Sequence, residues 1–236
     1  MQTTPDIQQE HHQKPLLGAD NNSLVALVAI NMVVYVMLGL IKTIYYLESL
    51  PLEKFYAQIF NPFILSNQWV KTPWALLTYN WVHDGFWLLF ANMIWLTLFS
   101  HTLQTNGANK HLFPIYFYSG LVGSIIFLAF GSSQPLMGAG VSVTAIVIAA
   151  IALIPNHKFL SNIAGGVSLW MVGILYLLLN AYLLKDGSII ALITTFLGGC
   201  TGLLYMVLLK RGIDLGKWMH QLIHSLNNSL APKNNG

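Results

Sequence analysis

Charged residues are scarce in this 236-residue chain, because Asp, Glu, Lys and Arg together make up only 8% of it, against about 25% in an ordinary soluble domain. So few charged side chains cannot cover a water-facing surface, which excludes an ordinary soluble globular protein. Cysteine is nearly absent, and the single Cys200 excludes an intramolecular disulfide and a cysteine-based zinc site. The net charge of +3 is too small and too scattered to indicate a nucleic-acid partner.

Apolar sequence is abundant instead. Hydrophobic residues make up 55% of the chain, and the mean hydropathy is +0.60. A membrane-spanning helix needs roughly 20 mostly apolar residues. Six segments meet or nearly meet this requirement, over residues 24–47, 81–103, 112–131, 137–154, 165–184 and 187–209. The sequence therefore predicts an all-α fold, a polytopic membrane bundle of six transmembrane helices surrounded by membrane lipids.

The chain divides into a polar tail, a six-helix membrane domain and a C-terminal tail, over residues 1–22, 23–210 and 211–236. No positively charged region abuts the first apolar segment and no small-residue cleavage site follows it, so we interpret this segment as an anchor. Residues 48–72 combine prolines and aromatic residues, which predicts a structured element in the membrane interface. Residues 217–226 predict an amphipathic interfacial helix, and a disordered tail is expected from Asn227 onward.

The distribution of Lys and Arg predicts the orientation. If the N-terminus is cytoplasmic, the cytoplasmic parts contain seven of these residues and the outer parts three, with Lys42 inside the first span left uncounted. This bias favours cytoplasmic termini at both ends, which an even number of spans also requires.

Small and polar residues in the predicted spans carry further information. Gly198, Gly199 and Gly202 favour close packing of the sixth span on the fourth, whose start is also rich in small residues.

His83 and Asn92 are nine residues apart, so a regular helix places them on opposite faces and a joint metal site is not expected. We interpret His83 as an interfacial residue bonded to a loop carbonyl. The sequence predicts neither a metal site nor a cofactor.

Several short motifs occur in an order that resembles a known family. They are residues 73–79 leading to His83, Asn92 with Met93, Trp95 and Leu96, Gly138 and Ala139 with residues 145–147 and 155–156, and residues 197–199 followed by 210–214. Together they resemble the rhomboid superfamily of intramembrane serine proteases, particularly its six-span bacterial members. The resemblance implies a bacterial inner-membrane protein whose helical bundle holds a water-filled cavity open to the outer face.

The resemblance also implies a set of site positions. In active members, a serine at the start of the fourth helix attacks a peptide bond and a histidine on the sixth helix accepts its proton, because serine is a poor nucleophile without a base. A histidine and an asparagine on the second helix help to stabilise the oxyanion. In this chain these positions, together with the family's earlier histidine, fall on Gly140, Phe196, Leu88, Asn92 and His83. The resemblance therefore implies a degenerate active site.

Ser142 is the one candidate for a replacement nucleophile. It lies two residues beyond the family position, which turns its side chain by about 200° around the helix. No His, Lys, Asp or Glu occurs between residues 187 and 209 to act as its base. We interpret Ser142 as a packing residue whose hydroxyl bonds to a carbonyl one turn earlier. We expect water to be excluded from the former cavity by Leu88, Phe196 and the aliphatic residues 189–193.

Three functional hypotheses follow. The favoured one is a pseudoprotease that binds transmembrane segments of other proteins. The alternative is an active intramembrane serine endopeptidase that uses Ser142. A remote alternative is a small transporter, for which the chain offers only neutral polar residues within its spans, namely Asn31, Asn92, Asn180, Thr194 and Thr195.

Overall fold

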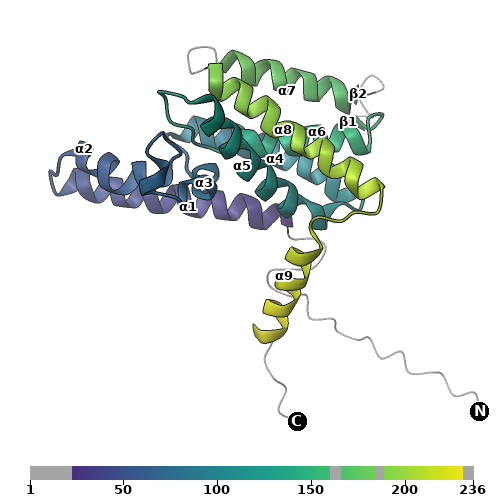
Figure 1. Ribbon diagram of the computed structural model, residues 1–236, viewed down its shortest axis with the longest axis horizontal. Helices are drawn as coiled ribbons and strands as arrows, with labels where there is room; N and C mark the ends of the chain where they lie inside the picture. The colour runs from purple at the N-terminus through teal and green to yellow at the C-terminus, as the bar shows by residue number, and fades with distance from the viewer. Residues whose placement is uncertain (1–22, 160–165, 184–188, 231–236) are drawn as a thin grey trace, which may run out of the picture.

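Long helices make up most of the computed structural model, which describes residues 23–159, 166–183 and 189–230 (Figure 1). Four helices of the described residues are long and apolar enough to cross a membrane. They are α1 (Ser23–Leu47), α4 (Phe86–Thr105), α5 (Leu112–Phe130), which the turn η5 (Asn109–His111) extends at its start, and α8 (Ile189–Lys210). The mostly helical membrane bundle is confirmed, whereas the count of six full-length spans is not.

Two further apolar helices are shorter, namely α6 (Gly140–Leu153) and α7 (Leu169–Leu183). Between them, β1 (Lys158–Phe159) pairs antiparallel with β2 (Val167–Ser168), a small departure from the all-α prediction. The predicted tails over residues 1–22 and 231–236, and the ends of the fifth and sixth predicted spans at residues 165, 184 and 187–188, lie outside the described residues.

The short helix α6 occupies the centre of the bundle, where it contacts α4, α5, α7 and α8. Nine of its 14 residues are buried. At about 1.5 Å per residue it is about 21 Å long, less than the roughly 30 Å of a hydrocarbon core. Such a short helix fits a membrane because its neighbours, and not lipid, surround it.

The extended segment before α6 completes the crossing. Irregular backbone at membrane depth is tolerated where protein satisfies its hydrogen bonds. Leu136 exchanges two backbone hydrogen bonds with Leu65, at 2.8 and 3.0 Å, and the Gly138 N–H donates to the Tyr79 carbonyl at 2.9 Å. These bonds hold the entrance of α6 against the segment between α1 and α4.

That connecting segment is folded, as the sequence predicts for residues 48–72. It contains two α-helical turns, α2 (Leu52–Phe55) and α3 (Ala75–Thr78), and one wider π-helical turn, η1 (Tyr56–Phe60). Three tighter 3₁₀ turns complete it, η2 (Asn61–Phe63), η3 (Trp69–Lys71) and η4 (Tyr79–Trp81). The Trp74 indole N–H donates to the Pro62 carbonyl at 2.8 Å, and the Asn67 amide donates to the Ser132 carbonyl at 2.6 Å. The segment is therefore tied both to itself and to the strand-like approach to α6.

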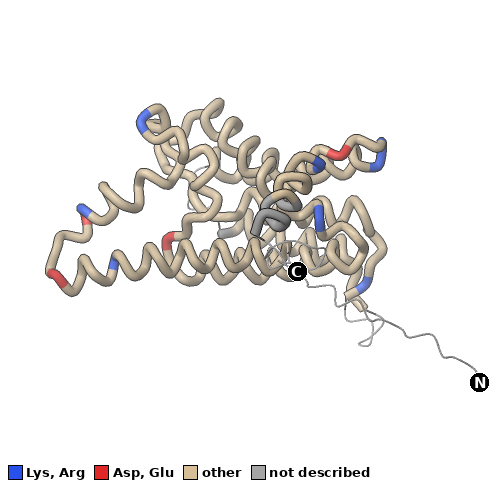
Figure 2. The backbone as a smooth tube through the Cα atoms, turned by 90° about the horizontal axis from the view of Figure 1, so that it is seen from below, with Lys and Arg blue, Asp and Glu red and all other residues tan. Residues whose placement is uncertain are grey.

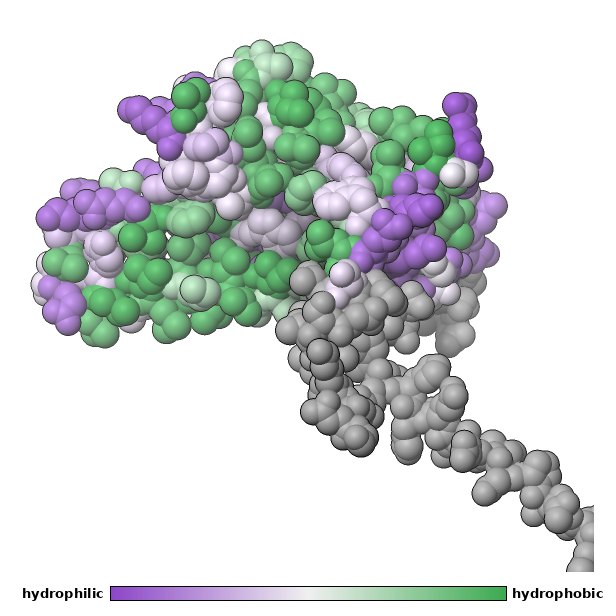
Figure 3. Space-filling model, turned by 60° about the horizontal axis from the view of Figure 1, so that its bottom comes forward, coloured by the Kyte–Doolittle hydropathy of each residue, from purple (hydrophilic) through white to green (hydrophobic). Residues whose placement is uncertain are grey.

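Polar and apolar residues are separated along the long axis of the molecule. Figure 3 shows hydrophobic residues over the middle of the visible face and hydrophilic residues gathered toward the two ends. Figure 2 likewise shows most of the Lys, Arg, Asp and Glu residues near the ends of the helices. This distribution matches a bilayer in which the long axis lies across the membrane.

The C-terminal helix α9 (Lys217–Leu230) leaves the bundle and runs across the direction of α1 (Figure 1). The amphipathic helix predicted over residues 217–226 is therefore present. The expectation of disorder from Asn227 onward is wrong for residues 227–230, because the helix continues to Leu230. The polar composition that suggested disorder is also that of the water-facing side of an amphipathic helix.

Candidate functional site

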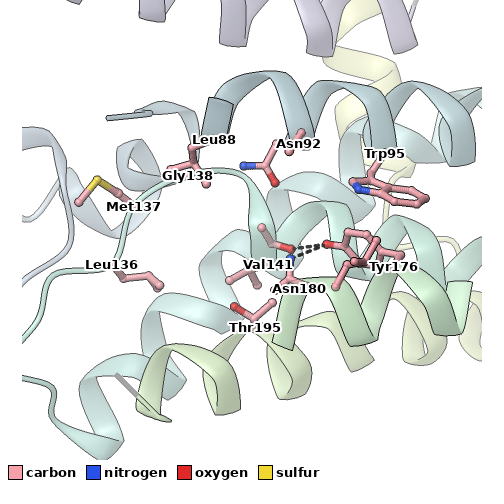
Figure 4. A pocket seen from close by; sticks show the side chains of 13 residues that line it. Leu88, Asn92, Trp95, Leu136, Met137, Gly138, Val141, Tyr176, Asn180 and Thr195 are labelled. Carbon is pink, nitrogen blue, oxygen red and sulfur yellow. Dashed lines mark hydrogen bonds between the residues drawn. The ribbon is translucent and has the colours of Figure 1, made fainter. Parts of the chain in front are cut away.

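A cavity of about 150 Å³ lies beside the first turn of α6 (Figure 4). Its wall is formed by Leu88, Ala91, Asn92 and Trp95 of α4, residues 136–138, Gly140 and Val141, Tyr176, Leu179 and Asn180 of α7, and Thr195 of α8. Of the described residues that line the cavity, none is Ser, Cys, His, Lys, Arg, Asp or Glu. The cavity therefore presents amide and hydroxyl groups on an otherwise apolar wall.

Gly140, the family serine position, lies directly on this cavity as the first residue of α6. A Cβ atom built on Gly140 would meet no other atom within 4 Å. The two residues before it complete a tight turn, in which Gly138 has a φ of +87° that favours glycine. The position could accommodate a serine side chain, but the chain supplies only a hydrogen atom there.

His83, Leu88 and Asn92 converge on the same turn. A Cβ atom built on Gly138 would lie 3.5 Å from His83 Cδ2 and 3.6 Å from both Asn92 Nδ2 and Leu88 Cδ2. The prediction that His83 and Asn92 lie on opposite faces of one helix is therefore wrong. Its premise fails because α4 begins at Phe86, so His83 belongs to the preceding turn, which Gly85 reverses with a φ of 107°.

The hydrogen bonds of His83 fix its tautomer. The Ala139 N–H donates to His83 Nε2 at 3.2 Å, and His83 Nδ1 lies 3.3 Å from the Trp81 carbonyl oxygen. A backbone N–H can only donate, so Nε2 carries no hydrogen and Nδ1–H donates to the Trp81 carbonyl. The predicted bond to a loop carbonyl is present. Nε2 thus holds the start of α6 and Nδ1 holds the preceding turn, which gives His83 a structural role beside the cavity.

The pKa of His83 is lowered from 6.5 to about 4, mainly because burial disfavours the charged form, although the bond to the Trp81 carbonyl opposes this. Between about pH 4 and pH 6.5 His83 binds a proton in the unfolded chain but not in the folded chain, so the stability of the fold decreases as the pH falls. We expect His83 to cost about 2 kcal/mol of stability between pH 7 and pH 5. Denaturant unfolding in detergent at the two pH values measures this loss.

The matched control for His83 is His83→Gln, whose amide oxygen can accept from Ala139 but does not titrate. The variant should lose less stability than the wild type between pH 7 and pH 5. Equal losses in both proteins would mean that another group accounts for the pH dependence.

Asn92 contributes a buried hydrogen-bond donor to the cavity wall that has no partner within the described structure. Its side chain is 6% exposed, and its Nδ2 atom is buried without a hydrogen-bond partner. Figure 4 shows the amide between α4 and the turn at Gly138, facing the cavity. A buried donor without a partner costs free energy, so Asn92 is poised to donate to an acceptor that enters the cavity.

The polar groups from α7 are already engaged with one another. Asn180 Nδ2 donates to the Tyr176 hydroxyl at 3.3 Å, and this hydroxyl lies 2.9 Å from Thr144 Oγ1 and 3.4 Å from the Gly140 carbonyl (Figure 4). These contacts connect α7 to the first turn of α6, next to the serine position. None of these four residues has a group that could serve as a strong base.

On α8, the residue that faces the cavity is Thr195. Thr195 is 7% exposed and lines the cavity, whereas Phe196 is 51% exposed and points away from it. The expectation that Phe196 and residues 189–193 fill the former site is therefore wrong. Ile190 and Ala191 do not line the cavity but pack against the cluster behind its wall, which includes Leu136 and Val141. Leu88 is the one residue among those expected to exclude water that lines the cavity. Neither residue of the Thr195–Phe196 pair supplies a base.

Ser142 lies on another face of α6, fully buried and outside the cavity. Its hydroxyl donates to the Tyr116 carbonyl of α5 at 2.7 Å and accepts from Asn80 Nδ2 at 2.7 Å. Ser119 Oγ lies 3.0 Å away. The predicted packing role agrees with this position, but the predicted bond to the preceding turn of its own helix is wrong, because the neighbouring helix offers a carbonyl at the contact.

We expect Ser142→Ala to destabilise the fold by about 1–2 kcal/mol, because the Asn80 amide loses its acceptor inside a buried network. Denaturant unfolding in detergent measures the loss. Ser133→Ala, at an exposed position in the loop before α6, serves as the matched control and should change stability by less than about 0.5 kcal/mol. Equal stability of Ser142→Ala and wild type would contradict the structural role.

The predicted close packing of α8 on α6 is confirmed. A Cβ atom on Gly198 would lie 2.6 Å from Val141 Cγ1, and Cβ atoms on Gly199 and Gly202 would overlap Thr144 and the Ala145 carbonyl. Only glycine permits this approach of the two backbones. The contact fixes the register that places Thr195 opposite the start of α6.

Comparison with protein families gives a match to the rhomboid domain. The family model matches residues 70–212, which is more than half of the chain and runs from η3 in the connecting segment through α8. No significant match to a curated protein or to a solved structure was found.

Proposed function

Because this chain belongs to the rhomboid family, we propose that it is a catalytically inactive member that binds transmembrane segments of other membrane proteins. The observation that carries the proposal is the lining of the cavity. Gly140 occupies the serine position, and the described lining residues include no base that could activate a hydroxyl. Without a paired nucleophile and base, covalent catalysis by serine has no starting point.

The position of the cavity supports a role in binding. It lies among α4, α6, α7 and α8, and the rim residues Leu88 and Leu179 are 41% and 42% exposed on the outside of the bundle. Their apolar side chains would face lipid, so an apolar segment could approach from the bilayer. Inside, the Asn92 amide would donate to a carbonyl of that segment that its own helix leaves free.

Site-specific photocrosslinking in membranes tests this binding. A photoreactive amino acid at position 179 should form adducts with transmembrane segments of other proteins, whereas the same group at position 125, which is exposed on α5, should not. Asn92→Leu should reduce the adducts at position 179, because it removes the unpartnered donor. Equal adducts from positions 179 and 125, or adducts indifferent to Asn92, would contradict the proposal.

We further propose that both termini face the cytoplasm and that the protein resides in a bacterial inner membrane. The bias of Lys and Arg supports this orientation. Cysteine accessibility at the exposed positions Lys71 and Lys158, at opposite ends of the bundle, would test it with an impermeant reagent. Labelling of position 71 but not 158 in intact cells is the expected result.

A further inference from the structure

A second cavity, of about 110 Å³, lies between α1 and the connecting segment. Its wall includes the buried side chains of Phe55, Phe60 and His83, and the side chains of Lys42 and Asp84 lie at its more exposed edge. The function proposed above does not use this cavity. It combines a largely aromatic interior with one cationic and one anionic group.

The two charges are connected through a hydroxyl. Lys42 Nζ donates to the Tyr56 hydroxyl at 2.7 Å and lies 4.9 Å from the centre of the Tyr56 ring. The Tyr56 hydroxyl lies 3.5 Å from Asp84 Oδ1, at the limit of a hydrogen bond. This long contact leaves Asp84 only weakly bound, so both the ammonium and the carboxylate retain capacity for a ligand.

The α1 surface that lines the cavity continues as an apolar strip toward the middle of the helix. Tyr35, Leu38 and Gly39 line the cavity together with Lys42, and their spacing places all four on one face of α1. Tyr35 and Leu38 are half-buried, so acyl chains in a membrane can reach this strip. Lys42, one turn beyond Leu38, lies at the level where a long basic side chain reaches for the headgroups.

We propose that the second cavity is a binding site for a zwitterionic phospholipid with a primary ammonium headgroup. Lys42 and Tyr56 would bind the phosphate, Asp84 would accept from the ammonium, and the acyl chains would lie along α1. A purely anionic lipid lacks the group that Asp84 needs, and a choline headgroup has no N–H to donate. The charges of the site therefore favour an ethanolamine headgroup.

Native mass spectrometry of the full chain in detergent tests this site, with phosphatidylethanolamine, phosphatidylglycerol and phosphatidylcholine added at equal concentrations. The wild type should bind phosphatidylethanolamine most tightly. Lys42→Met should weaken this binding about tenfold, the expected effect of losing one charge-assisted hydrogen bond. Asp84→Asn, an exposed change that leaves the packing intact, should abolish the preference over phosphatidylglycerol.

Lys54→Met and Glu53→Gln, both at exposed positions of α2, serve as matched charge controls and should bind as the wild type does. Soluble phosphoethanolamine should not compete at concentrations comparable to the lipid, because it lacks acyl chains. Unchanged lipid binding in both Lys42→Met and Asp84→Asn would overturn the proposal. The contacts of Lys42, Tyr56 and Asp84 would then serve only to hold the connecting segment in place. Effective competition by phosphoethanolamine would also overturn the lipid assignment.

Discussion

The double variant Gly140→Ser, Thr195→His is expected to react with a fluorophosphonate probe at least about 100-fold faster than Gly140→Ser alone. A serine at position 140 meets no steric obstacle and faces the cavity, but by itself it has no base. Position 195 lies on the same cavity, so a histidine there supplies the missing proton acceptor. Labelling kinetics of the purified protein in detergent measure the effect.

The matched control places the histidine one residue away. Gly140→Ser, Phe196→His should react no faster than Gly140→Ser, because residue 196 is half-exposed and points about 100° away from residue 195. Faster labelling with histidine at position 196 than at 195 would show that Phe196, and not Thr195, faces the cavity. It would then support Phe196 as the family histidine position, as the sequence motif suggested.

Replacing Gly202 by alanine is expected to destabilise the fold by about 3 kcal/mol, at the upper end of the usual cost of overpacking. The added Cβ would overlap the Ala145 carbonyl, which belongs to the backbone of α6 and cannot turn aside. The two helices must separate, and the cavity at the start of α6 must change with them. Unfolding in detergent measures the stability.

Gly39→Ala on α1 is the control for Gly202→Ala, because a Cβ atom at Gly39 would meet nothing within 4 Å. This variant should be as stable as the wild type or slightly more stable, since alanine is the better helix former. If the two variants behaved alike, the close approach of α6 and α8 would have no energetic importance.

The sequence predicted the long helices well because hydropathy reports length and polarity directly. The segment over 24–47 and the start of α5 at Leu112 agree with the structure to within a residue. The start of α4 was missed by five residues, because Trp81 and Val82 are as apolar as the helix that follows. Hydropathy does not register the positive φ at Gly85 that separates them from α4.

The candidate site was predicted in its composition but only partly in its geometry. The sequence identified Gly140 and Asn92 as site positions because each lies within a family motif, and both residues line the cavity. The choice between Thr195 and Phe196 depends on the rotation of α8, which the contacts of Gly198 and Gly202 with α6 determine. A shift of one residue changes the facing direction by about 100°, so spacing alone could not decide it.

The sequence also failed to predict that His83 and Asn92 lie close together at the start of α6. Their separation in sequence suggested opposite faces, whereas the turn over residues 82–85 returns His83 to the start of α6. The signal that could have identified this turn is Asp84–Gly85, a pair typical of turns that directly precedes the apolar run.

The most direct test of catalytic inactivity is reaction of the wild-type protein with a fluorophosphonate probe, alongside Ser142→Ala. We expect no covalent adduct on either protein, because the serine position is Gly140 and Ser142 is buried in a network away from the cavity. An adduct on the wild type that Ser142→Ala abolishes would contradict catalytic inactivity and identify the protein as an active serine hydrolase.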